Sequence, residues 1–193
     1  MVSVFDICML LLLLVGNSSS HCIELQVLDD GRYTWRHNSV LLHLANSLSL
    51  IKNTSLFADL PSFPSPSLIT GDSLRPDLVL VLNNTSVYLL ELTFGVESKI
   101  TINSDRKAAK YCPLFNSLRS KYTNIKFVNL SMSALGIFGS SSDSLLQMLQ
   151  DLHFDNNFQQ SIVMKASNIA IRCSYYIYCR RNKTWTSPEL LNF

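Results

Sequence analysis

Residues 74–110, LRPDLVLVLNNTSVYLLELTFGVESKITINSDRKAAK, contain the pattern that decides the fold. Residues 78–82 and 87–92 are almost wholly apolar and rich in β-branched side chains, as expected of strands buried on both faces. The Asn, Thr and Ser residues between them predict a tight turn. The Lys and Arg residues that follow predict a basic helix. The stretch is therefore interpreted as a strand, a turn, a second strand and a helix.

Two carboxylates interrupt the apolar runs. Asp77 directly precedes the first strand, and Glu91 lies near the end of the second. A buried carboxylate without a partner is costly. Asp77 and Glu91 must therefore either lie at strand ends in water or share a cation.

The length of the loop decides whether the two carboxylates can meet. A three-residue loop at 83–85 places Asp77 directly opposite Glu91, whereas a loop of two or four residues places Asp77 opposite Leu90 or Leu92. Three-residue hairpins with an Asn in the left-handed region are common. The three-residue register is thus plausible, and the sequence alone leaves the others open.

The predicted helix has a basic face. Lys107, Lys110 and Tyr111 are spaced to share one side of it. Between positions 99 and 126 lie seven of the sixteen basic residues, against one acid, Asp105. Such a cluster is either a binding surface for phosphates or an ordinary solvated helix surface.

These motifs resemble a known family. Pro76-Asp77, the hairpin, Glu91-x-Thr93 and Lys107-x-x-Lys110-Tyr111 resemble the PD-(D/E)XK nuclease-like domain found at the C-terminal end of reverse-transcriptase proteins of animal retroelements. The resemblance covers the chain from Cys22 to its end and is most specific over residues 75–111. Outside that core it includes His21-Cys22, residues 31–41, residues 174–177 and Trp185.

The chain departs from the family pattern in three places. Thr93 stands where the nuclease superfamily usually has lysine, and Gly95 stands where the retroelement relatives tend to have proline. Those relatives also lack Pro113. Because proline removes a backbone donor and clashes with the preceding turn, Pro113 is expected to kink or split the basic helix.

The resemblance implies a fold and a metal site. The fold would be an α/β domain of the restriction-endonuclease-like type, with a small mixed sheet flanked by helices. Asp77 and Glu91, helped by the carbonyl of Leu92, would bind Mg²⁺ or Mn²⁺. The bound metal would lower the pKa of the attacking water and stabilise charge on the phosphate.

The resemblance also implies an activity and partners. The function would be endonucleolytic hydrolysis of DNA phosphodiesters, with Lys107 or Lys110 positioning the water or the phosphate. Thr93 could donate a hydrogen bond but could not neutralise charge. DNA is the expected partner, packing on the polymerase domain of a parent polyprotein is a second expectation, and the nucleus is the location that the family favours.

Two rival functions come from other classes. One is a catalytically inactive remnant that binds nucleic acid or a protein partner, and the other is a secreted binding module. No G-x-S-x-G, H-E-x-x-H or G-x-x-x-x-G-K motif is present, which argues against a serine hydrolase, a zinc protease and a nucleotide hydrolase. The five cysteines form no C-x-x-C pair, so we predict no zinc site.

The N-terminal residues are expected to lie outside the core. Residues 7–15, ICMLLLLLV, form an apolar run that suits a signal-peptide core but is too short for a membrane span. Residues 1–6 carry Asp6 and no Lys or Arg, which argues against secretion. We therefore interpret residues 1–20 as a signal-like or stray hydrophobic leader, and residues 21–193, with a C-terminal helix and tail, as one domain.

Other patterns predict the remaining elements. His37 is predicted to be a polar helix start and His43 a surface position, because no acid or cysteine lies at a useful spacing from either. Lys165 and Arg172 in the last apolar helix argue against membrane insertion. The predicted elements are a hairpin of 23–28 and 32–35, a helix from Asn38 or Ser39 to about Ile51, an irregular loop over 52–72, a strand over 124–130, and helices over 143–152 and 158–180.

Overall fold

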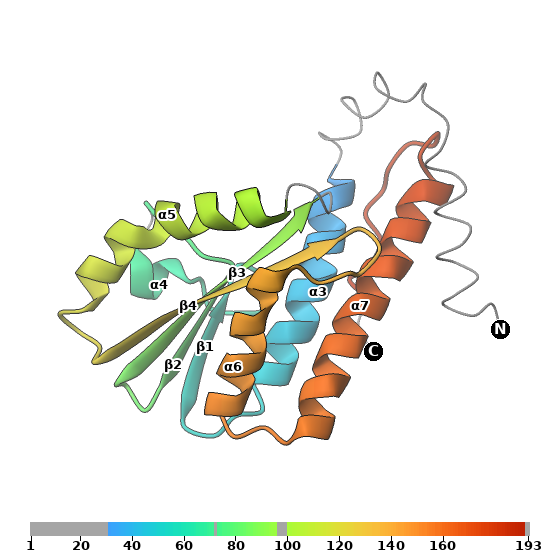
Figure 1. Cartoon of the computed structure of the whole chain (residues 1–193). Helices are drawn as coiled ribbons and strands as arrows, with labels where there is room; N and C mark the ends of the chain where they lie inside the picture. Colours follow the sequence, from blue (N-terminus) through green and yellow to red (C-terminus); the bar gives the residue numbers. More distant parts are fainter. Residues whose placement is uncertain (1–30, 72, 96–99, 192–193) are drawn as a thin grey trace.

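A computed structural model describes residues 31–71, 73–95 and 100–191 (Figure 1). The predicted leader over residues 1–20 and the strand over 23–28 lie outside these residues, so both stay predictions. The described elements are α3 (Arg32–Leu48), β1 (Thr54–Ala58), α4 (Ser67–Thr70), β2 (Leu78–Leu82), β3 (Ser86–Gly95), α5 (Ile100–Leu118), β4 (Asn124–Ser133), η2 (Ser140–Ser142), α6 (Asp143–Asp151) and α7 (Asn156–Cys179).

The four strands form one mixed sheet in the order β1-β2-β3-β4. β1 pairs with β2 and β2 with β3 in antiparallel fashion, while β4 runs parallel to β3. A parallel neighbour needs a crossover connection, and α5 supplies it. The predicted α/β class, with a small mixed sheet flanked by helices, is confirmed.

Helices cover both faces of the sheet. α5 lies on one side, and α3, α6 and α7 lie on the other (Figure 1). Because side chains alternate along a strand, each strand contributes to both layers. The layer under α5 contains Val79, Val81, Val87 and Leu89 from the strands and Tyr111, Leu114 and Leu118 from the helix.

The hairpin has the three-residue register. Leu82 pairs with Ser86 and Leu78 with Leu90, so Asp77 stands one step further on, opposite Glu91. Asn83 and Asn84 both adopt positive φ, 51° and 55°, which Asn tolerates better than most residues. The predicted alignment of the two acids is confirmed.

The first described helix corrects the prediction around residue 35. Arg32–Trp35 is the first turn of α3 rather than a strand, and the helix ends at Leu48 rather than near Ile51. Tertiary contacts explain the early start. The Arg32 guanidinium donates to the carbonyls of Arg180 and Lys183 at 2.8 and 2.6 Å, and Trp35 packs edge-on against the C-terminal tail. These contacts come from residues about 150 positions away, which local patterns do not register.

Two further expectations were wrong. The predicted loop over 52–72 contains the edge strand β1, which pairs with β2, and the short helix α4. The predicted split of the basic helix at Pro113 is wrong, because α5 continues from Ile100 to Leu118 with the proline inside it. The alternative, a kink at Pro113, stays a prediction. Pro113 is exposed, and nothing else in the structure explains why the helix continues past it.

The remaining predicted elements agree with the structure within a few residues. They are β4, α6 and α7. No helix in the described ranges is long and apolar enough to cross a membrane.

Candidate active site

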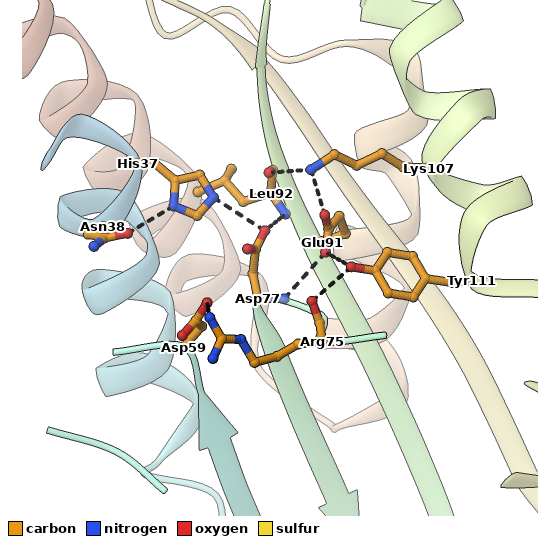
Figure 2. A network of polar contacts seen from close by, with 9 residues as sticks. All are labelled: His37, Asn38, Asp59, Arg75, Asp77, Glu91, Leu92, Lys107 and Tyr111. Carbon is orange, nitrogen blue, oxygen red and sulfur yellow. Dashed lines mark hydrogen bonds and ion pairs between the residues drawn. The ribbon is translucent and has the colours of Figure 1, made fainter. Parts of the chain in front are cut away.

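Asp77 is held at the end of the hairpin by main-chain and side-chain contacts. Its carboxylate Oδ2 accepts a hydrogen bond from the Leu92 N–H at 2.7 Å and lies 3.2 Å from His37 Nε2 (Figure 2). Its own carbonyl accepts from the Asp59 N–H at 2.9 Å. The carboxylate is therefore fixed between β3 and α3.

Glu91 is buried, with only 4% of its surface exposed, and both of its oxygens have partners. Oε1 lies 2.5 Å from Lys107 Nζ, and Oε2 accepts from the Tyr111 hydroxyl at 2.9 Å and from the Asp77 N–H at 3.3 Å. Lys107 Nζ also reaches the Leu92 carbonyl oxygen at 3.4 Å. Figure 2 shows the resulting network, which runs from His37 on α3 through the hairpin to Lys107 and Tyr111 on α5.

The two carboxylates differ in proton affinity. Burial, reinforced by the nearby charge of Asp77, raises the pKa of Glu91 and outweighs the opposing effect of Lys107 and Tyr111. Burial also acts to raise the pKa of Asp77, but the hydrogen bond and charge of His37 and the Leu92 N–H outweigh it, so this pKa is lowered. The pKa values of the two carboxylates are thus shifted in opposite directions, and Lys107 is the cation that opposes the shift of Glu91.

The sheet face under α5 changes from apolar to polar at this site. Beyond Leu89, the buried positions on that face are occupied by Glu91 and Thr93 of β3 and by Asn129 and Ser131 of the adjacent β4. Thr93 Oγ1 is buried and has no hydrogen-bond partner among the described residues. A buried hydroxyl without a partner is uncommon and calls for an explanation such as a bound water or ion.

The two candidate lysines have different environments. Lys107 joins the carboxylate network, whereas Lys110 is exposed and places its amine over the Tyr111 ring, 4.9 Å from the ring centroid. Lys110 makes no ion pair with Asp77 or Glu91. The structure therefore brings together Asp77, Glu91, Leu92 and Lys107, with Thr93 on the same strand, and leaves Lys110 outside.

His37 is the site residue that the sequence interpretation missed. It lies inside α3 rather than at its start, and its partner Asp77 is 40 residues away. A signal was present: His37 has helical spacing to the buried residues Leu41, Leu44 and Leu48. Once the helix is extended back to Arg32, the histidine falls on the core-facing side.

His43 was also misplaced by the prediction. It is buried rather than on the surface, and its Nε2 lies 3.0 Å from the Ile162 carbonyl oxygen. This contact joins α3 to α7 and lies away from the carboxylates, so His43 is interpreted as a structural residue.

The predicted metal ligands are Asp77, Glu91 and the Leu92 carbonyl. No group of three or more His, Cys, Asp and Glu side chains in the described ranges could hold a metal ion. The predicted set contains two carboxylates and one main-chain carbonyl, and Mg²⁺ commonly takes one or two protein carboxylates and completes its shell with water. The Lys107 ammonium already bridges Glu91 Oε1 and the Leu92 oxygen, which shows that these two oxygens can share one cation. Carboxylate and carbonyl oxygens are the donor types that a hard divalent ion takes.

Two other residues of the basic cluster, Arg119 and Lys126, lie at a different place from the carboxylates. Lys126 is paired with Asp151 at 2.6 Å. A cavity of about 260 Å³, lined by Phe115, Arg119 and residues 123–126, lies where α5 ends and β4 begins. It contains neither carboxylate of the site.

Replacing Tyr111 by phenylalanine should destabilise the fold. The Tyr111 hydroxyl is shared between Glu91 Oε2 at 2.9 Å and the Arg75 carbonyl at 3.0 Å, and the ring is fully buried. Hydrogen bonds to charged groups contribute about 1.5–3 kcal/mol, so we expect a loss of that size in denaturant unfolding. Tyr122→Phe is the matched control, because Tyr122 packs against the same core without a hydroxyl partner among the described residues. Equal stability of the two variants would show that the Tyr111 hydroxyl contributes nothing.

His37 should make stability depend on pH. Burial acts to lower the pKa of His37, but the hydrogen bond and charge of Asp77 outweigh it and the pKa is raised. A raised pKa in the folded state gives stability that is complete below the unfolded value, about 6.5, and is lost as the pH rises through the folded value. The free energy of unfolding without metal should therefore fall from pH 6 to pH 8.

The variant His37→Gln should remove this fall, as measured by urea unfolding in EDTA at several pH values. His43→Gln is the control on the same helix. The pKa of His43 is lowered, because burial outweighs the hydrogen bond to the Ile162 carbonyl, so its contribution has the opposite sign. An unchanged slope in His37→Gln would contradict the coupling to Asp77.

Comparisons with known proteins find a similar fold but no related sequence. No protein-family model and no curated protein sequence matches the chain. Among solved structures, the chain is similar to a cap-snatching endonuclease of the Phenuiviridae, with 16% identity and a TM-score of 0.47. The match covers 80% of this chain and 66% of that chain, just under two thirds of its length. The interpretation of the site therefore rests on the contacts of its own residues and not on this similarity.

Proposed function

We propose that this chain is a metal-dependent endonuclease that hydrolyses phosphodiester bonds of DNA. One observation carries the proposal: Asp77 and Glu91 stand opposite each other at the end of the hairpin, with the Lys107 ammonium beside the Glu91 carboxylate. Two acids can hold a metal ion that assists attack on a phosphate, and an ammonium beside them can stabilise the charge that develops.

The residues present would divide the work as follows. Asp77, Glu91 and the Leu92 carbonyl would hold Mg²⁺ or Mn²⁺. The bound ion would lower the pKa of an attacking water and neutralise charge on the phosphate. His37 donates to Asp77 and keeps that carboxylate oriented.

Two further groups would act on the substrate. The Lys107 ammonium would stabilise the negative charge that grows on the phosphate during attack. The Thr93 hydroxyl, buried and without a partner among the described residues, would donate a hydrogen bond to the water or to a phosphate oxygen. Lys110 has no contact with the carboxylates, so we assign it no step.

The sequence resemblance supports a finer proposal about origin. We infer that the domain derives from a retroelement and that a polymerase domain is a partner, on the basis of the motifs over residues 75–111 and the segment 31–41. Residues 32–41 lie in α3, which supplies His37. The proposed endonuclease can be tested without this context.

The direct test is cleavage of supercoiled DNA by the purified chain with Mg²⁺ or Mn²⁺, with EDTA as the control. Metal-dependent nicking supports the proposal. Binding of Mn²⁺ and DNA without any cleavage would favour the inactive remnant. A matched RNA substrate shows whether the site discriminates the sugar.

A further inference from the structure

The position of the Lys107 amine suggests more than a role in charge stabilisation. Nζ lies 2.5 Å from Glu91 Oε1 and 3.4 Å from the Leu92 oxygen. These are two of the three oxygens that the proposed function assigns to the metal, so this inference rests on that function. One ammonium and one divalent ion cannot both take the same side of Glu91 Oε1 at bonding distance.

The metal-free protein needs the ammonium there. The Glu91 side chain is only 5% exposed, and the carboxylate of Asp77 stands opposite it across the hairpin. The charges of two neighbouring carboxylates repel each other, and an uncompensated charge on a buried group such as Glu91 is costly. Lys107 supplies the compensating charge, since it is the cation whose amine contacts Glu91 in the described ranges.

Lys107 also has a way out of this position. Its side chain is 26% exposed, whereas that of Glu91 is almost fully covered. The long stem of a lysine lets the amine move while the helix stays in place. Displacement of the amine therefore requires no rearrangement of α5 or of the sheet.

We propose that Lys107 substitutes for the metal in the metal-free protein and is displaced from Glu91 and Leu92 when a divalent ion binds. The displaced ammonium then faces the substrate side of the site, where it is free to contact a phosphate. Binding of the metal ion and release of the Lys107 amine towards the substrate are then coupled. The ion pair also keeps Glu91 in a geometry that is ready for the metal.

Chemical labelling of the wild-type chain tests the displacement. Lysine amines are acylated with an N-hydroxysuccinimide ester with and without Mn²⁺, and labelling at each site is measured by peptide mass spectrometry. We expect labelling of Lys107 to rise at least about fivefold with Mn²⁺, the lower end of usual coupling between two sites. Lys110, exposed on the same helix and outside the network, is the internal control and should not change.

Metal affinity provides an independent readout. The chain is titrated with Mn²⁺ alone, and free Mn²⁺ is measured by electron paramagnetic resonance. Because Lys107→Met removes the competing cation, we expect its Kd for Mn²⁺ to fall at least about fivefold relative to wild type. Lys110→Met should bind as wild type does. Thermal unfolding in EDTA shows whether each variant is folded.

The outcomes separate the two proposals. Mn²⁺ binding by wild type with unchanged Lys107 labelling, or with equal or weaker binding by Lys107→Met, would overturn the displacement and leave the endonuclease standing. Absence of Mn²⁺ binding in wild type and in both variants would instead remove the metal site, and with it the proposed function.

Discussion

Replacing Asp77 by asparagine should lower the rate of metal-dependent DNA cleavage by at least about a hundredfold, because loss of a residue that merely supports a metal ligand already costs 10- to 100-fold. Asparagine keeps an oxygen that can accept from the Leu92 N–H, so the hairpin should stay intact. It lacks the negative charge that attracts a divalent ion. The rate is measured on supercoiled DNA at several Mn²⁺ concentrations, and the affinity for Mn²⁺ should fall together with it.

Asp59→Asn is the matched control for this change. Asp59 lies near the site, but its carboxylate is 42% exposed and pairs with Arg75 at 3.0 Å rather than with the carboxylate network. Its loss should leave cleavage within about threefold of wild type, since exposed ion pairs contribute about 1 kcal/mol or less. Full cleavage by Asp77→Asn would contradict the proposed site and point to another nuclease in the preparation.

The hairpin could be predicted because its information is local. Strand alternation and the two Asn residues at 83 and 84 make the three-residue register one of the available choices, and the structure has that register, which places Asp77 opposite Glu91. These patterns need no knowledge of the rest of the chain. The spacing of Lys107 and Tyr111 likewise predicts that they share one helix face. That this face meets Glu91 is a tertiary contact, which only the structure shows.

The parts that local patterns missed depend on distant contacts. The local sequence around Arg32 and Trp35 predicts a strand, but the structure has a helix there. Arg32 donates to a carbonyl just beyond the end of α7, and Trp35 packs against the rings of Tyr176 and Trp185. The edge strand β1 is stabilised by pairing with β2 and not by its own apolar pattern. Tertiary packing commonly overrides weak local preferences in this way.

The same cause explains why His37 was missed. Its role follows from a contact with Asp77, and that contact exists only when α3 packs across the end of the hairpin. No spacing rule links positions 37 and 77. A prediction that the helix begins at Arg32 would have placed the His37 imidazole on the side of the helix that faces Asp77.

Replacing Lys107 by alanine should slow cleavage by about a hundredfold at saturating Mn²⁺, which is the usual cost of removing one donor that stabilises transition-state charge. The hydroxyl of the neighbouring Thr93 can donate a hydrogen bond but cannot neutralise charge. The loss should therefore appear in kcat, while binding of Mn²⁺ by Asp77 and Glu91 survives. Single-turnover cleavage combined with Mn²⁺ titration separates the two effects.

The lysines elsewhere on the surface provide the comparison for this variant. Lys110→Ala should cost less than about tenfold, because its amine lies over the Tyr111 ring and away from both carboxylates. Lys165→Ala, on the exposed side of α7, should leave the rate unchanged. If Lys107→Ala cleaves within about threefold of wild type, then an ammonium from α5 is not part of the reaction. Its contact with Glu91 would in that case only stabilise the metal-free fold, since a buried carboxylate without a partner cation is costly whether or not the chain is an enzyme.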